Sequence, residues 1–520
     1  MSTLKNIKNI FQFLQNEDGS VQKRTIRSIS WVGVTSAIVY SLSFIKGVIL
    51  ARLLFPEVFG LMSICLIVIR GVEIFTETGF GVALIYRRSN FDEEKDTAFT
   101  LLVMRGFLIS FFIYAIAPFV AKYYKHDDLE LIIRIIAFSL IINSFGNINS
   151  IRLQIDLNFK KLSYIEQINN LFSFAIVVSL AYYFRNIWAL VIGHIVFCLL
   201  GVFLSYVFIP GKPRFCLNFV VARKLFSYGK FITGLAIVIF ISLEIDNVII
   251  GKILGLSALG YYVIAFTLAN LPATHLSKVV SRVLFPAYSE LQGNLPALQS
   301  AFLTVYKIIA IINIPILAGF IFLAPEIVRI IYGEKWLPAA DALRILAIFG
   351  CFRSFSALSG YLFNAIGKPN LTFYLNLIRL IFLLALIFPL TERYGLVGAS
   401  LAVTAPVFLQ YVLENYLVGK AIGVNYYQII KVLMLPVIYS IGMVAVIILL
   451  KSLFFIINTQ SFQFSIFGIF LMNFDYNSAP YALRNVEVLL VIITGMLTYF
   501  SLSHKVFIYQ IRKIRSMVKR

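Results

Sequence analysis

The stretch ARLLFPEVFGLMSI, residues 51–64, has a counterpart two hundred residues later in GKILGLSALGYYVI, residues 251–264. Each segment follows one apolar run and opens another. The offset pairs a basic residue, a leucine and a glycine of the first segment with those of the second: Arg52 with Lys252, Leu54 with Leu254, and Gly60 with Gly260. Chance similarity between two apolar helix starts is the competing interpretation, but the match includes the charge and the glycine. The pattern therefore predicts a duplicated unit.

The composition places both copies in a membrane. The chain has 520 residues, of which 60% are hydrophobic and only 13% are charged, and its mean hydropathy is +0.90. A soluble domain could not cover its surface with so few polar groups. Apolar runs of about twenty residues recur along the whole length, as in membrane-spanning helices. The sequence therefore predicts an all-α polytopic membrane protein.

Apolar runs between polar breaks give about fourteen transmembrane helices. The expected spans are 30–50, 58–85, 98–121, 128–149, 163–183, 186–209, 226–250, 258–283, 299–324, 339–366, 370–390, 395–418, 428–450 and 484–503. The stretch 452–474 is also apolar, but it contains Asn and Gln residues, and we take it as an external or re-entrant loop. If it crossed the membrane, the basic C-terminal tail would lie outside, against the positive-inside rule.

The repeat groups these spans into two pseudo-symmetric six-helix bundles followed by two C-terminal helices. The expected divisions are a basic cytoplasmic N-terminal segment 1–28, an N-terminal bundle 29–209, a basic cytoplasmic linker 210–225, a C-terminal bundle 226–418, two additional helices 428–503 with an external loop 451–483, and a basic cytoplasmic tail 504–520. An even number of helices per copy gives both the same orientation, so that an axis along the membrane normal relates them. Such proteins bind cargo between the halves and alternate access by rocking one bundle against the other.

The net charge of +21 does not indicate a nucleic-acid-binding protein. The basic residues flank apolar runs, as the positive-inside rule requires, and no segment is long enough to form a soluble basic face. Membrane lipids with anionic headgroups are the expected partners, and both termini are expected in the cytoplasm.

The sequence contains no motif for catalysis, nucleotide binding or metal binding. The four cysteines and four histidines lack ligand spacing, and GxxxxGK[ST], HExxH and GxSxG are absent. We expect no catalytic residue, metal or cofactor, and a driving force from an ion gradient or the membrane potential. Proton and sodium coupling both stay open.

Four blocks carry a family resemblance: LARLLFPEVFGLMSICLIVIRGVEIFTETGFGVALIYRR (50–88), DNVIIGKILGLSALGYYVIAFTLANLP (246–272), VVSRVLFPAYSELQ (279–292) and LAPEIVRIIYGEKWLPAADALRILAIFG (323–350). They resemble the polysaccharide transporter family, the Wzx or WzxC-like flippases of the multidrug/oligosaccharidyl-lipid/polysaccharide (MOP) superfamily. The resemblance implies a V-shaped transporter whose two bundles enclose a central cavity lined by spans 1, 2, 7 and 8. It also implies that the protein is a multi-pass protein of the bacterial inner membrane.

The same resemblance implies a cargo. This is an undecaprenyl-pyrophosphate-linked oligosaccharide, the repeat unit of an O-antigen, capsule or exopolysaccharide, moved from the cytoplasmic to the periplasmic leaflet. A polysaccharide polymerase and the export machinery are further candidate partners.

Arg70, Glu73 and Glu77 stand three and four residues apart in the span 58–85, hence on one helical face. An ionisable group in mid-span costs about 2.5–3.5 kcal/mol on insertion scales, so it usually faces an interior or a cavity. We expect the three to face the central cavity, where Arg70 meets a pyrophosphate or sugar and a carboxylate carries a coupling proton. A structural salt bridge that lets this span pack is the alternative.

Other charged and polar residues complete the set of candidates. The second copy lacks the two glutamates, and its cavity candidates are Asn270, His275 and Lys278, joined by Arg353 and Arg379 deep in later spans. For the two arginines, Glu414 is an alternative partner to a cargo headgroup. Arg105 lies nearer a span end, where snorkelling is the default.

Lys46, Glu244 and Asp246 are the candidates for coupling or gating. The repeat places Lys46 opposite Asp246, so that an ion pair between them would form an external gate; snorkelling of Lys46 is the alternative. Residues two apart on a helix point to different sides, and we prefer Asp246 over Glu244 because it keeps the repeat register.

Two other functions compete with a flippase. A drug/cation antiporter of the MATE type would favour an acidic, aromatic cavity, whereas the mid-membrane arginines favour an anionic cargo. An integral-membrane polysaccharide polymerase or glycosyltransferase usually needs a large external loop with catalytic residues, and the stretch 451–483 carries one acidic residue, Asp475.

Overall fold

A computed structural model describes residues 38–76, 79–86, 90–156, 158–459, 490–504, 506 and 509–510. At 82, 226–236, 238–239, 275–287 and 453–459 it describes the backbone alone. The expected segment 1–28 and nearly all of the tail 504–520 lie outside these residues. By its packing the chain divides into two units, unit 1 through Val263 and unit 2 from Ile264.

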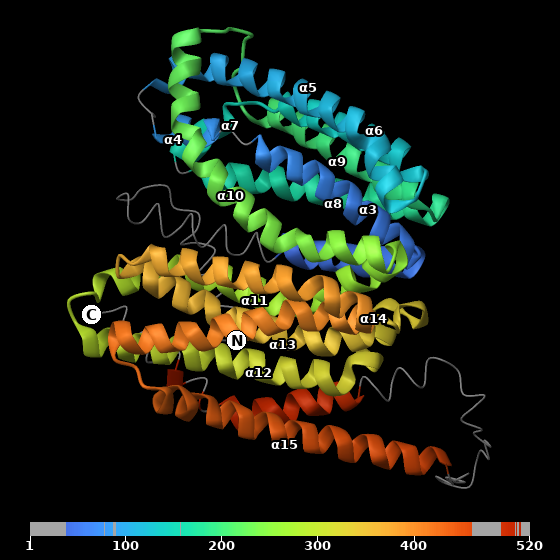
Figure 1. The fold of residues 1–520 in the computed structure, drawn as a ribbon, viewed down its shortest axis with the longest axis vertical. Coiled ribbons are helices and arrows are strands. Elements are labelled where there is room, and N and C mark those ends of the chain that lie inside the picture. Colours follow the sequence, from blue (N-terminus) through green and yellow to red (C-terminus); the bar gives the residue numbers. More distant parts are fainter. Residues whose placement is uncertain are drawn as a thin grey trace, which may run out of the picture. The chain divides into compact units, whose positions relative to one another are not determined.

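Unit 1 is a bundle of helices (Figure 1). After a helical stretch over 38–53 come α3 (Pro56–Phe75), α4 (Phe80–Tyr86), α5 (Phe91–Tyr124), α6 (Asp128–Ser144), α7 (Ser150–Ile155), α8 (Phe159–Phe184), α9 (Ile187–Phe208), α10 (Phe219–Ile253) and the first turns of α11 (Leu256–Glu290). Pro56 starts α3, where its missing N–H costs nothing. The side chains of Asn186 and Asn218 cap α9 and α10 by accepting from backbone N–H groups of the first turn.

Within unit 1, α6 packs between α5 and α9, and α10 packs against α3, α4 and α5. Helix α10 therefore belongs by packing to the first unit, although it follows the basic linker 210–225 that separates the two halves of the sequence. The linker itself lies along α5. The backbone N–H groups of Arg214 and Cys216 donate to Asp96 Oδ1 at 3.1 Å and to Thr100 Oγ1 at 2.9 Å.

Unit 2 contains the rest of α11, α12 (Leu295–Tyr332), a short 3₁₀ helix (Glu334–Trp336), α13 (Ala339–Ala365), α14 (Pro369–Ile422), α15 (Tyr426–Thr459) and the helix Leu490–His504 (Figure 1). Helix α13 packs against α12 and α14, and α12 also packs against α15. Gly395, at φ +58°, breaks α14 into two helical segments, which correspond to the expected spans 370–390 and 395–418.

The repeat that the sequence suggested is visible as a reciprocal contact inside unit 1. A Cβ atom on Gly60 would lie 1.9 Å from the carbonyl oxygen of Leu256, and one on Gly260 would lie 2.0 Å from the carbonyl oxygen of Pro56. The starts of α3 and α11 thus cross with their backbones in contact, which only glycine permits. Equivalent residues of two copies related by a two-fold axis make contacts of this reciprocal kind.

The all-α polytopic prediction is confirmed. In the described part of the chain, nine helices are long and apolar enough to cross a membrane. The stretch 452–474 differs at its start, because α15 continues to Thr459 without a proline or glycine to end it. The rest of that stretch lies outside the described residues.

Candidate functional site

The expected single helix over 58–85 is wrong, because α3 ends at Phe75 and α4 begins only at Phe80. The hydroxyl of Thr76 donates to the carbonyls of Val72, at 2.6 Å, and of Glu73, at 3.2 Å, and Gly79 has φ +62°. Side chains that bond the local backbone and a glycine with positive φ both oppose helix continuation. Arg70 and Glu73 therefore lie on α3, and Glu77, which follows its end, lies outside the described residues.

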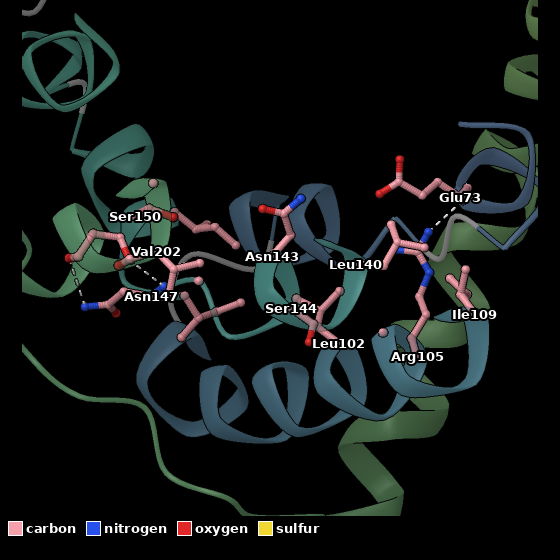
Figure 2. Close-up of a pocket in the computed structure, with 16 residues that line it drawn as sticks. Glu73, Leu102, Arg105, Ile109, Leu140, Asn143, Ser144, Asn147, Ser150 and Val202 are labelled. Carbon is pink, nitrogen blue, oxygen red and sulfur yellow. Dashed lines mark hydrogen bonds between the residues drawn. The ribbon is translucent and has the colours of Figure 1, made fainter. Parts of the chain in front are cut away.

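Arg105 of α5 supports this end of α3. Its Nη2 atom donates to the backbone carbonyl of Glu73 at 2.6 Å (Figure 2). The same atom lies 3.4 Å from Thr76 Oγ1, to which it also donates. A cation at a helix C-terminus satisfies an orphan carbonyl and interacts favourably with the helix dipole. The sequence predicts snorkelling at a span end for Arg105, and the structure places its guanidinium on the end of α3. The stretch TETG, residues 76–79, is the sequence signal for this role of Arg105, because a helix that ends there needs hydrogen-bond donors for its last carbonyls.

A cavity of about 440 Å³ lies beside the break, lined by α3, α5, α6, α7 and α9 (Figure 2). Its polar lining residues are Glu73, Arg105, Asn143, Ser144, Asn147, Ser150 and Ser205. Interrupted helices occur at membrane depth where they are buried in protein or line a water-filled cavity. The polar cavity therefore accounts for a helix that ends at Phe75 within the membrane-spanning region.

Two asparagines hold one end of this cavity. Asn147 Nδ2 donates to the carbonyls of Ile209, at 3.2 Å, and Gly211, at 3.0 Å, while its Oδ1 accepts from the backbone and side chain of Asn149. Both asparagines are buried, and their bonds tie the turn between α6 and α7 to the residues that follow α9. The cavity therefore has a fixed wall at this end.

Arg70 has its partner on α10. Its Nη1 atom lies 3.4 Å from Glu244 Oε1, and Asn247 Nδ2 donates to Glu244 Oε2 at 2.9 Å. The Arg70 side chain is 57% exposed and that of Glu244 only 16%. An interhelical salt bridge, the structural alternative considered for Arg70, is therefore present in unit 1.

Asp246, the other acidic residue of α10, points elsewhere, as expected for a residue two positions away. It is 3% exposed, and its Oδ2 accepts from the hydroxyl of Tyr262 at 2.6 Å. Its Oδ1 has no hydrogen-bond partner in the described part of the chain. The ion pair expected between Lys46 and Asp246 is therefore not formed in this structure, where a neutral tyrosine hydroxyl is the group bonded to the carboxylate.

The remaining candidates lie in unit 2. Asn270 is on α11, and Arg353 on α13 lies 5.9 Å from the ring centroid of Phe349. Arg379 is on α14 and acts electrostatically on both Arg353 and Glu414. Glu414, also on α14, is buried, and its Oε1 accepts from Gln410 Nε2 at 2.8 Å. For His275 and Lys278 only the backbone of α11 is described.

Known proteins are similar to this chain in sequence and in fold. A family model described as "Polysaccharide biosynthesis protein" matches residues 49–341. The teichuronic acid biosynthesis protein TuaB of Bacillus subtilis (strain 168) is 28% identical over 67% of this chain and 71% of its own length. The lipopolysaccharide biosynthesis protein WzxC of Escherichia coli (strain K12) is 24% identical over 80% of this chain and 85% of its own length.

Among solved structures, the lipid II flippase MurJ in an inward closed conformation matches with a TM-score of 0.69 and 15% identity. The match covers 92% of this chain and 99% of that one, and at this identity it shows the fold. The apolar helices and these relatives make the chain a multi-pass inner-membrane transport protein rather than an enzyme. Because the family model covers more than half of the 520 residues, the chain belongs to the polysaccharide biosynthesis protein family, the polysaccharide transporters of the MOP superfamily.

Proposed function

We propose that this protein flips undecaprenyl-pyrophosphate-linked oligosaccharide repeat units from the cytoplasmic to the periplasmic leaflet by alternating access. The observation that carries the proposal is the polar cavity beside the broken helix α3. With the N-terminus in the cytoplasm, α5 starts and α6 and α9 end on the cytoplasmic side. The cavity then lies toward the leaflet from which the cargo is taken.

The chemistry of the cavity supports a sugar-containing cargo. Asn143, Ser144 and Ser150 offer amide and hydroxyl groups, and Arg105 and Glu73 add both signs of charge. Such planar and hydroxyl groups bind sugar hydroxyls by hydrogen bonds, and guanidinium groups bind phosphate oxygens. An ion gradient or the membrane potential supplies the driving force in this proposal. A polysaccharide polymerase and the export machinery then receive the flipped unit.

A deletion of the gene separates the flippase from a polymerase. Without a flippase, complete lipid-linked repeat units accumulate and stay in the cytoplasmic leaflet, inaccessible to a membrane-impermeant glycosidase added to spheroplasts. Without a polymerase, single units accumulate outside and the same enzyme digests them. Accumulated units that the glycosidase digests in the deletion strain would contradict the proposal.

A further inference from the structure

An apolar groove lies beside the polar cavity of unit 1. It has a volume of about 510 Å³ and lies between the end of α3 and the middle of α5. Its lining residues are Val72, Phe75, Thr76, Leu108, Ile109 and Phe112. The hydroxyl of Thr76 donates to the carbonyls of Val72 and Glu73, so the accessible lining of the groove is apolar.

The groove and the polar cavity meet along one face of α5. Ile109 lines both, and Arg105, one turn earlier, lines the polar cavity (Figure 2). Leu108 and Phe112 stand three and seven residues after Arg105, so all four side chains share this face. A molecule that fills both spaces therefore has a polar head, an apolar chain, and a junction beside a guanidinium group. Phosphate is the group that a guanidinium binds best at such a junction.

The order of the two spaces along α5 matches a lipid in the cytoplasmic leaflet. Leu102 and Arg105 line the polar cavity, and Leu108 and Phe112, which line the groove, follow them. With the N-terminus in the cytoplasm, as in the proposed function, α5 starts on the cytoplasmic side. The helix rises about 10 Å from Arg105 to Phe112, so the groove lies closer to the bilayer centre than the cavity does. A lipid of that leaflet also has its head toward the cytoplasm and its chain toward the centre.

The groove is open along its side. The side chains of Phe75, Leu108 and Phe112 are 54%, 68% and 53% exposed, whereas Ile109 is 5% exposed and forms the floor. A chain much longer than the groove can therefore lie in it with its first units and continue into the bilayer. Lipid tails are as apolar as these side chains, so any preference for one chain comes from van der Waals packing.

We propose that this groove holds the first isoprene units of a polyprenyl chain whose phosphate-linked head lies in the polar cavity; the identity of the chain rests on the proposed flippase function. The continuity of the groove with the cavity at Ile109 carries the inference. One phenylalanine from each helix, Phe75 and Phe112, supplies a flat ring against which a methyl-branched chain packs.

Photo-crosslinking of the full-length protein locates the chain without any transport assay. Nanodiscs of phosphatidylglycerol contain a small fraction of undecaprenyl phosphate, and p-benzoylphenylalanine replaces either Phe112 or Phe111. Phe111 is the next residue of α5, is 74% exposed, and is not one of the lining residues. At position 112 the adducts should be enriched in undecaprenyl phosphate about tenfold over its share of the bilayer. At position 111 they should follow the bilayer composition. Adducts at 112 that also follow the bilayer composition would overturn the proposal.

Leu108→Trp tests the groove by filling it. The larger ring stays apolar at an exposed position, so the protein should fold, and the Kd for undecaprenyl phosphate should rise about tenfold. Phe111→Trp is the matched control and should bind like the wild type. Phe112→Ala is a second variant that removes a ring from the lining, and it should also weaken binding. The measurement is native mass spectrometry of the full-length protein titrated with undecaprenyl phosphate. Unchanged binding by both groove variants would contradict the proposal.

Reconstituted flipping separates this inference from the proposed function. If position 112 captures undecaprenyl phosphate but the wild type flips no lipid-linked oligosaccharide, the groove stands and the flippase function fails. If the wild type flips the cargo and Leu108→Trp flips it at the same rate as Phe111→Trp, the function stands and the groove is not used by the cargo. The expected result is flipping about tenfold slower by Leu108→Trp than by Phe111→Trp.

Discussion

Gly60→Ala should prevent the protein from accumulating in the membrane in folded form. The new Cβ would lie 1.9 Å from the backbone oxygen of Leu256, and a backbone cannot move aside as a flexible side chain can. Overpacking against movable side chains costs about 1–3 kcal/mol, and a collision between two helix backbones lies at or above that range. The measurement is the yield of monodisperse protein by fluorescence-detected size-exclusion chromatography, with the Tm of what is recovered.

The reciprocal glycine provides an internal comparison. Gly260→Ala should be as harmful as Gly60→Ala, because it places a Cβ 2.0 Å from the carbonyl of Pro56 at the same crossing. The double variant should cost less than the sum of the two, since one methyl group already forces the helices apart. Gly319→Ala, with no atom within 4 Å of its new Cβ, is the matched control and should leave the yield unchanged. Normal yield and Tm for Gly60→Ala would show that α3 and α11 do not cross as described.

Arg105→Gln should reduce transport at least tenfold while the protein still folds. The shorter side chain leaves the Glu73 carbonyl at the end of α3 without its charged donor, and a hydrogen bond to a charged group contributes about 1.5–3 kcal/mol. It also removes the positive charge from the cavity. Arg105→Lys keeps the charge but loses the planar fork, so intermediate transport is expected. The measurement is polysaccharide export in a deletion strain complemented with each variant, normalised to membrane protein level.

Arg152→Gln is the matched control for Arg105→Gln. Arg152, on α7 of the same unit, pairs with Asp92 at 3.0 Å but is 54% exposed, and such exposed pairs contribute about 0–1 kcal/mol. Export by this variant should match the wild type. Equal export by the Arg105 and Arg152 variants would mean that neither the end of α3 nor the charge in the cavity matters for transport.

The architecture could be predicted because it depends on hydropathy averaged over about twenty residues and on an internal sequence repeat. Runs of about twenty apolar residues form transmembrane helices. The pairing of Gly60 with Gly260 in the sequence indicates two copies, and both glycines lie at one helix crossing. The end of α3 could not be predicted from the same averages. Hydropathy continues through 58–85, whereas the break depends on the local backbone at Thr76 and Gly79.

The partners of the charged residues could not be predicted, because they depend on which helix faces which. The repeat register paired Lys46 with Asp246, but Asp246 bonds Tyr262, and Arg70 meets Glu244 instead. The role of Arg105 could not be predicted either, because a sequence indicates depth in the membrane but not the neighbour at that depth. That neighbour is the backbone carbonyl of Glu73 at the end of α3.

Flipping by the purified protein in liposomes tests the central claim most directly. Liposomes are loaded symmetrically with a fluorescent undecaprenyl-pyrophosphate-linked oligosaccharide, and an added glycosidase digests the units that reach the outer leaflet. The wild type should make nearly all of the lipid-linked sugar accessible to the glycosidase, whereas liposomes without protein expose only about half of it. Liposomes with Arg105→Gln should also approach full accessibility, but much more slowly than those with the wild type. Digestion that stops at half with correctly folded wild-type protein would contradict the assignment of this chain as a flippase for lipid-linked oligosaccharide.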